Sequence, residues 1–169
     1  MRKIIIGVMG PGDKAKATDM ENAYEIGKFI AQQGWVLLTG GRNVGVMNAA
    51  SQGAKSENGL TIGILPGDNN TNGVSEAVDI AIVTDMGNAR NSINVLSSDI
   101  VIACGMGAGT ASEITLALKA NKKVILLNDD EESNFFFKNL SPLNVYVVNS
   151  LVQALKTARE VLVLATNVD

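Results

Sequence analysis

A glycine-rich turn that ends in an acidic residue is the segment of the sequence best suited to chemistry. Residues 105–113 read Gly-Met-Gly-Ala-Gly-Thr-Ala-Ser-Glu, and they follow the apolar run 99–104. Glycines let backbone N–H groups approach a ligand closely, and the start of a helix adds the positive end of its dipole. The pattern predicts a phosphate-binding cradle with one acid beside it. Its expected members are Gly107, Ala108, Gly109, Thr110 and the catalytic candidate Glu113.

Two further glycine turns follow apolar runs earlier in the chain. The first contains Gly10 and Gly12, and the second contains Gly40, Gly41, Arg42 and Gly45. Ligands of open α/β sheets bind at the carboxyl ends of the strands, so three such turns predict a site for an anionic, phosphorylated ligand. Val46 and Met47 stand where a nucleoside triphosphatase loop needs lysine and a hydroxyl. The third turn also lacks the dinucleotide spacing, so a ligand with a single phosphate is expected.

Three side chains have alternative interpretations. Glu113 stabilises an oxocarbenium-like transition state or activates water in one, and it closes a capping box with Thr110 in the other. Arg90 grips phosphate oxygens in one interpretation and forms a salt bridge to Asp85 or Asp99 in the other. Arg42 either touches the phosphate or is an exposed loop residue.

The composition excludes several classes of function. The chain has 169 residues, no histidine, one cysteine and a net charge of −3. Without histidine, neither a Ser-His-Asp or Cys-His nucleophile nor a histidine metal site can form, and no metal site is expected. The negative charge and the 4% aromatic content argue against nucleic acid as a partner. No apolar run is long enough to span a membrane, and we expect a cytoplasmic protein in which Cys104 is a core residue.

Short apolar runs alternate with helical stretches along the whole chain. Strands are predicted at Lys3–Val8, Trp35–Thr39, Thr61–Leu65, Ile80–Val83, Ile100–Cys104, Val124–Leu127 and Val145–Val148. Helices are predicted at Asp19–Gln33, Val44–Lys55, Met86–Ser97, Ala111–Ala120 and Ser150–Leu164, and residues 128–133 are predicted to be a solvated turn and a helix start. Thr18 and Glu21 suggest a capping box, and Gly34 a helix end.

The alternation predicts an α/β fold. Continuous apolar strands are typical of parallel sheets that are covered on both faces. We expect a single Rossmann-like doubly wound domain over residues 1–169, with a mainly parallel sheet of six or seven strands and helices on both faces.

The order of the motifs resembles the LOG family of cytokinin-activating phosphoribohydrolases, also labelled lysine decarboxylase-like. The motifs are Thr39–Met47, Gly63–Pro66, Asp85–Arg90 and Gly105–Glu113, and the similarity runs to about Asn128. The family signature P-G-G-x-G-T-x-x-E is matched at its last two glycines, its threonine and its glutamate. LOG enzymes place lysine after the catalytic arginine, whereas Asn91 follows Arg90 here. The segment Ala89-Arg90-Asn91 is more similar to the molybdenum-cofactor carrier-like branch of this superfamily.

The resemblance implies two functions. The favoured one is binding without turnover, in which a carrier or sensor holds a phosphorylated molecule such as a pterin or a nucleotide. The alternative is hydrolysis of a nucleoside 5′-monophosphate to free base and ribose 5-phosphate, with Arg90 orienting and Glu113 catalysing. No cofactor is required, a molybdenum cofactor or a nucleotide is the implied ligand, and a decarboxylase is not supported. Both families also imply a homodimer or homotetramer, with Met86–Ser97 in the interface.

Overall fold

The computed structural model describes residues 2–166 and contains seven strands within them. The strands are β1 Ile5–Met9, β2 Val36–Thr39, β3 Leu60–Leu65, β4 Ile80–Val83, β5 Ile100–Cys104, β6 Lys123–Leu127 and β7 Val145–Val148. The α-helices are α1 Ala17–Gln32, α2 Gly45–Ser56, α3 Asn91–Ser97, α4 Ala108–Lys119, α5 Glu131–Leu140 and α6 Leu151–Thr166. A short 3₁₀ helix, η1 Gly87–Arg90, leads into α3.

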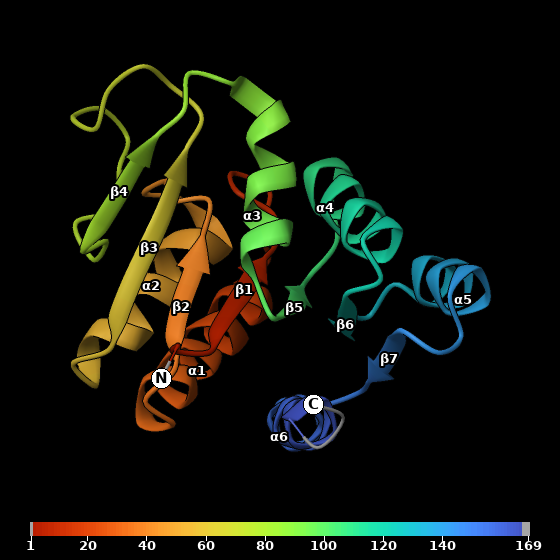
Figure 1. Ribbon diagram of the computed structural model, residues 1–169. Coiled ribbons are helices and arrows are strands. Elements are labelled where there is room, and N and C mark those ends of the chain that lie inside the picture. The colour runs from red at the N-terminus through yellow and green to blue at the C-terminus, as the bar shows by residue number, and fades with distance from the viewer. Residues whose placement is uncertain (1, 167–169) are drawn as a thin grey trace.

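All seven strands form one parallel sheet in the order β4-β3-β2-β1-β5-β6-β7 (Figure 1). The chain first winds outward from β1 to β4 and then returns to the other side of β1 at β5. The strand order therefore reverses between β1 and β5, which is where open α/β sheets leave a crevice for ligands. The predicted doubly wound α/β fold is confirmed.

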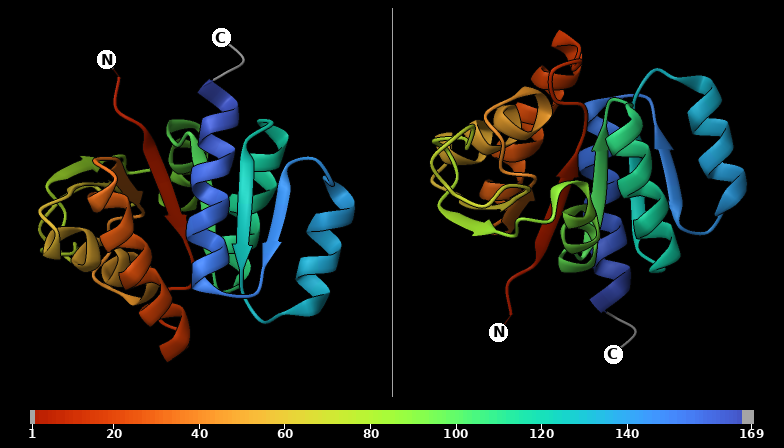
Figure 2. Two further views of the ribbon diagram at one scale, coloured as in Figure 1. Left: turned by 90° about the horizontal axis from the view of Figure 1, so that it is seen from below. Right: turned by 90° about the horizontal axis from the view of Figure 1, so that it is seen from above.

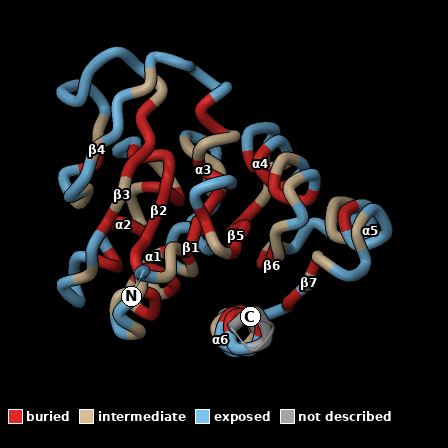
Figure 3. The backbone as a smooth tube through the Cα atoms, in the orientation of Figure 1, coloured by how far each residue is buried: buried red, intermediate tan, exposed pale blue. Residues whose placement is uncertain are grey.

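Helices cover both faces of the sheet (Figure 2). Residues of α1, α2 and α6 pack with Ile6, Val8 and Ile102 in one core cluster. Residues of α3, α4 and α5 pack with Leu38, Val101 and Leu126 in the other. The central strands are consequently buried along their length, as Figure 3 shows, and this accounts for their unbroken apolar sequence.

Several predicted helix boundaries were wrong. The prediction for 128–133 contained the start of α5, but the sequence reading missed the helix itself, whose exposed phenylalanines obscure its periodicity. Helix α1 begins at Ala17, and the Lys16 N–H donates to Asp19 Oδ2 at 3.1 Å, so Thr18 and Glu21 form no capping box. Gly34 ends that helix as predicted, with φ +70°.

The link between β3 and β4 contains no helix, although the two strands are parallel. On the side of the sheet that carries α3, no helix lies over this edge (Figure 1). Ile80 and Ile82 of β4 are 45% and 43% exposed there. Within residues 2–166, no helix combines the length and the hydropathy that a membrane crossing needs.

Candidate functional site

A cavity of about 340 Å³ lies at the carboxyl ends of β1, β2 and β5. It occupies the point where the strand order reverses, and we call it the glycine-loop cavity. It is lined by Val8, Met9, Gly10, Pro11, Gly12, Asp13, Lys14, Gly40, Arg42, Met47, Asn88, Arg90, Asn91, Gly107, Ala108, Gly109, Thr110 and Glu113.

The three predicted glycine turns meet at this cavity. All of the predicted site residues line it except Gly41 and Gly45. A side chain at Gly41 would collide with Leu65 and the Gly63 backbone, and one at Gly45 would collide with the carbonyls of Pro11 and Gly12. These two glycines therefore hold the second turn against its neighbours instead of facing the cavity. The Val46 N–H also donates to the Pro11 carbonyl at 3.1 Å, which fixes α2 to the first turn.

Helix α4 opens directly onto the cavity. Its N-cap is Gly107, which offers no capping side chain, and the helix begins at Ala108. Thr110 and Glu113 consequently lie within the helix, and the alternative of a capping box between them was wrong. The first N–H groups of a helix have no acceptor inside it, so those of Ala108, Gly109 and Thr110 remain available to a ligand. The buried Thr110 Oγ1 also makes no hydrogen bond to any described residue.

Arg90 is buried beneath the second glycine turn. Its Nη1 donates to the Gly40 carbonyl at 2.6 Å and to the Ile64 carbonyl, so the alternative of a salt bridge to Asp85 or Asp99 was wrong. A side chain at position 40 would occupy the space that the guanidinium takes. Burial lowers the pKa of Arg90, the Glu113 carboxylate opposes this, and Arg42 adds to it. Arg90 Nε has no partner among the described residues.

Glu113 is the buried acid of the cavity, with 7% of its surface exposed. Its Oε1 accepts a hydrogen bond from Asn94 Nδ2 at 2.8 Å. Burial raises the pKa of Glu113 to about 7, against the hydrogen bond from Asn94 and the charge of Arg90, which both lower it. Asn94 Oδ1 has no partner among the described residues. Polar atoms of Arg90, Asn94 and Thr110 thus lack a partner among the described residues, and such buried groups call for one.

Sequence reasoning missed several lining residues. Lys14 adds a cation beyond the first glycine turn, and its position two residues after Gly12 could have identified it. Asn88 and Asn91 reach the cavity from the segment around Arg90. Arg42 is exposed, and its backbone pairs with Val74 of the long β3–β4 link. With Lys14, Arg42 and Arg90 beside the free N–H groups of α4, the cavity can balance an anionic group.

The fold and the position of this cavity define the chain as a Rossmann-like α/β protein with a ligand-sized cavity at its switch point. More particularly, the chain belongs to the SLOG cluster4 family, whose model matches residues 3–156. This confirms the resemblance to the LOG-like superfamily that the glycine turns predicted.

Solved structures of similar proteins agree. The molybdenum cofactor binding protein from the phototrophic bacterium Rippkaea orientalis is 62% identical, with a TM-score of 0.93, and the match covers 96% of this chain and 99% of that one. The molybdenum cofactor carrier protein of Chlamydomonas reinhardtii is 48% identical, with a TM-score of 0.90 and the same coverage.

A more distant relative is an enzyme. The cytokinin riboside 5′-monophosphate phosphoribohydrolase of Mycobacterium tuberculosis is 34% identical over 96 residues, which are 56% of this chain and 51% of the enzyme. The two solved carrier and binding proteins therefore match far more of the chain than this hydrolase does.

Proposed function

We propose that the chain is a carrier that binds a phosphorylated, cofactor-like molecule in the glycine-loop cavity and releases it unchanged. The molybdenum cofactor is the favoured cargo, in keeping with the names of the two similar solved structures. The observation that carries the proposal is the start of α4, where free N–H groups and the unpartnered Thr110 hydroxyl form a receptor for phosphate oxygens.

The side chains present suit the organic part of such a cargo. Lys14, Arg42 and the first turn of α4 neutralise a phosphate group, and Met9 and Met47 give an apolar wall for a flat ring. The chain has no histidine, and its single cysteine, Cys104, is fully buried. Burial raises the pKa of that thiol to about 12, so it offers no thiolate to a metal. We infer that the protein holds the cargo through its phosphate and its ring.

A phosphoribohydrolase is the second candidate, and one observation favours it. Because burial brings the pKa of Glu113 close to neutral, that carboxyl is suited to general acid–base chemistry. Arg90 favours the carrier instead, because its Nη1 is already occupied by the carbonyls of Gly40 and Ile64. In the hydrolase, Arg90 would instead have to orient the substrate's phosphate.

Two measurements on the purified protein separate these functions. Incubation with nucleoside 5′-monophosphates should release no free base or ribose 5-phosphate, and release that disappears in Glu113→Gln would overturn the carrier proposal. Protein isolated from molybdate-supplied cells should contain molybdenum and a pterin, detected by elemental analysis and by pterin fluorescence. Thr110→Val should lose both, whereas Thr115→Val, an exposed hydroxyl on the same helix, should keep them. Equal loading of the two variants would contradict the proposed receptor.

We further propose that the carrier is a homodimer or homotetramer and works in the cytoplasm without nucleic acid or membrane partners. The uncovered side of β3 and β4 supports the assembly, because Leu60, Ile80 and Ile82 form an exposed apolar strip there. Leu96, at the exposed side of α3 within the predicted interface segment, adds to it.

A further inference from the structure

A second cavity, of about 440 Å³, lies at the carboxyl ends of β6 and β7, beside the start of α1. Its volume is within the range of small-molecule sites, about 300–1,000 Å³. We call it the asparagine-lined cavity; its lining is Thr18, Asp19, Asn22, Leu127, Asn128, Asp129, Glu131, Asn134, Val148 and Asn149. None of these residues lines the glycine-loop cavity.

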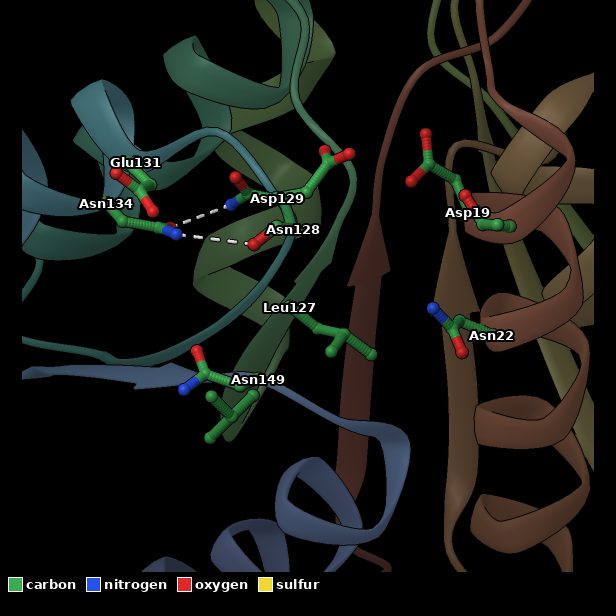
Figure 4. A pocket seen from close by; sticks show the side chains of 10 residues that line it. Asp19, Asn22, Leu127, Asn128, Asp129, Glu131, Asn134 and Asn149 are labelled. Carbon is green, nitrogen blue, oxygen red and sulfur yellow. Dashed lines mark hydrogen bonds between the residues drawn. The ribbon is translucent and has the colours of Figure 1, made fainter.

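The polar side chains on one wall of the asparagine-lined cavity already have partners in the protein. Asn128 Nδ2 donates to Asn134 Oδ1 at 2.9 Å, and Asn134 Nδ2 donates back to the Asn128 carbonyl at 3.3 Å (Figure 4). Asp129 is paired with Lys16, and Glu131 lies in the first turn of α5, where the helix dipole favours an acid. These contacts explain the charges on this wall without a ligand.

The opposite wall, on α1, carries an acid and an amide that also line the cavity; Asp19 lies in the first turn of that helix, where the dipole favours an acid. Asp19 and Asn22 are three residues apart on the helix, so they share one face. In Figure 4 Asn22 and Leu127 point toward one another across the cavity. Asp19 is 7% exposed, and its Oδ2 accepts the Lys16 N–H, but among the described residues its Oδ1 has no hydrogen bond and neither has the Asn22 amide. Asp19 therefore keeps acceptor capacity for a ligand in the cavity.

The backbone is shaped around this carboxylate. Gly105 has φ +77°, and a Cβ atom added there would lie 2.5 Å from the Asp19 Cγ. A glycine at this position therefore leaves room for the acid beside the end of β5. The side chains of Leu127 and Val148 supply apolar surface to the same cavity.

We propose that the asparagine-lined cavity is a second small-molecule site, which takes a heterocycle carrying a 2-amino-4-oxopyrimidine edge. That edge presents a ring N–H and an amino group side by side, with a carbonyl next to them. Asp19 can accept from the two donors, the Asn22 amide can donate to the carbonyl, and the flat ring lies on Leu127 and Val148. Guanine and pterin rings share this edge. The site is independent of the carrier function proposed above.

Two pairs of probes test this edge directly. Guanosine and inosine differ only in the 2-amino group. Lumazine carries an oxo group where pterin carries the 2-amino group, so each pair tests the expected amino donor. Saturation-transfer NMR and calorimetry should show binding of guanosine or pterin, with inosine and lumazine at least tenfold weaker. Preference between guanosine and pterin identifies the natural source of the edge. Equal binding within both pairs, or no binding at millimolar concentration, would overturn the proposal.

Substitutions locate the binding. Asn22→Leu and Asp19→Asn should each weaken the better probe at least tenfold, whereas Asn139→Leu, on the exposed side of α5, should not. Asp19→Asn keeps an acceptor for the Lys16 N–H, so the fold is retained in at least one test variant. Thr110→Val should leave the probe's affinity unchanged while it abolishes cargo loading. Loss of the probe in Thr110→Val with normal binding in Asn22→Leu would place the ligand in the glycine-loop cavity and refute the second site.

Discussion

Glu113 connects the chemistry of the cavity to the stability of the fold. Because burial raises its pKa from 4.5 to about 7, the folded state binds a proton that the unfolded state releases between those values. The stability that this proton provides is complete below pH 4.5 and is lost as the pH rises through 7, a change of about 3 kcal/mol.

Glu113→Gln should therefore unfold at a higher denaturant concentration than the parent at pH 8 and at the same concentration at pH 4.5. A glutamine at this position can still accept the hydrogen bond from Asn94 Nδ2. Denaturant titrations of both proteins across this pH range measure the difference. A constant gap between the two proteins at every pH would show that the carboxyl does not titrate as proposed.

At the residue scale, the sequence predicted the position of Glu113 in the cavity but not its hydrogen-bond partner. The glycine turns, with Arg90 and Glu113, predicted part of the lining of the cavity, because parallel strands bring their carboxyl ends to one edge. The Asn94–Glu113 hydrogen bond and the carbonyl partners of Arg90 were not predictable, because they join segments 19 to 50 positions apart through side-chain geometry.

Two glycines at the start of α4 have different structural roles. Gly105 needs a positive φ and leaves room for Asp19, whereas Gly109 lies inside the helix with no atom within 4 Å of an added Cβ. Gly105→Ala should lower the free energy of unfolding by at least 2 kcal/mol, by strain and collision. Gly109→Ala should raise it by about 0.5–1 kcal/mol, because alanine favours helices. Chemical denaturation measures both, and similar effects of the two changes would contradict these roles.

At the level of elements, the sequence pattern predicted strands better than helix ends. Unbroken runs such as Ile100–Cys104 are buried on both faces and match β5. The start of α4 was predicted three residues late, at Ala111, because a Gly-Ala-Gly segment has low helix propensity; the helix begins at Ala108. Helix α5 was missed because Phe135 and Phe136 face outward, which blurs the 3.6-residue pattern.

At the scale of the whole molecule, the proposed assembly rests on the uncovered edge of the sheet. Ile82→Glu places a charge in the exposed apolar strip of β3 and β4, and Leu96→Glu places one on the exposed side of α3. Each change should reduce the mass in solution to that of one 17.7 kDa chain. Val152→Glu, at a side chain 76% exposed on α6, is the matched control and should leave the mass unchanged. Sedimentation velocity gives the masses. A parent protein that already sediments as a single chain would refute the assembly.

Because Cys104 is buried, the rate at which its thiol reacts can report local opening of the fold. The thiol lies at the end of β5 and donates to the Asp19 carbonyl of α1 at 3.2 Å. A thiol reagent can reach it only when α1 separates from the sheet, so the labelling rate measures that fluctuation in the unmodified chain. A saturating cargo or base should slow the labelling in proportion to its occupancy. An unchanged rate at saturation would mean that α1 opens independently of both ligands.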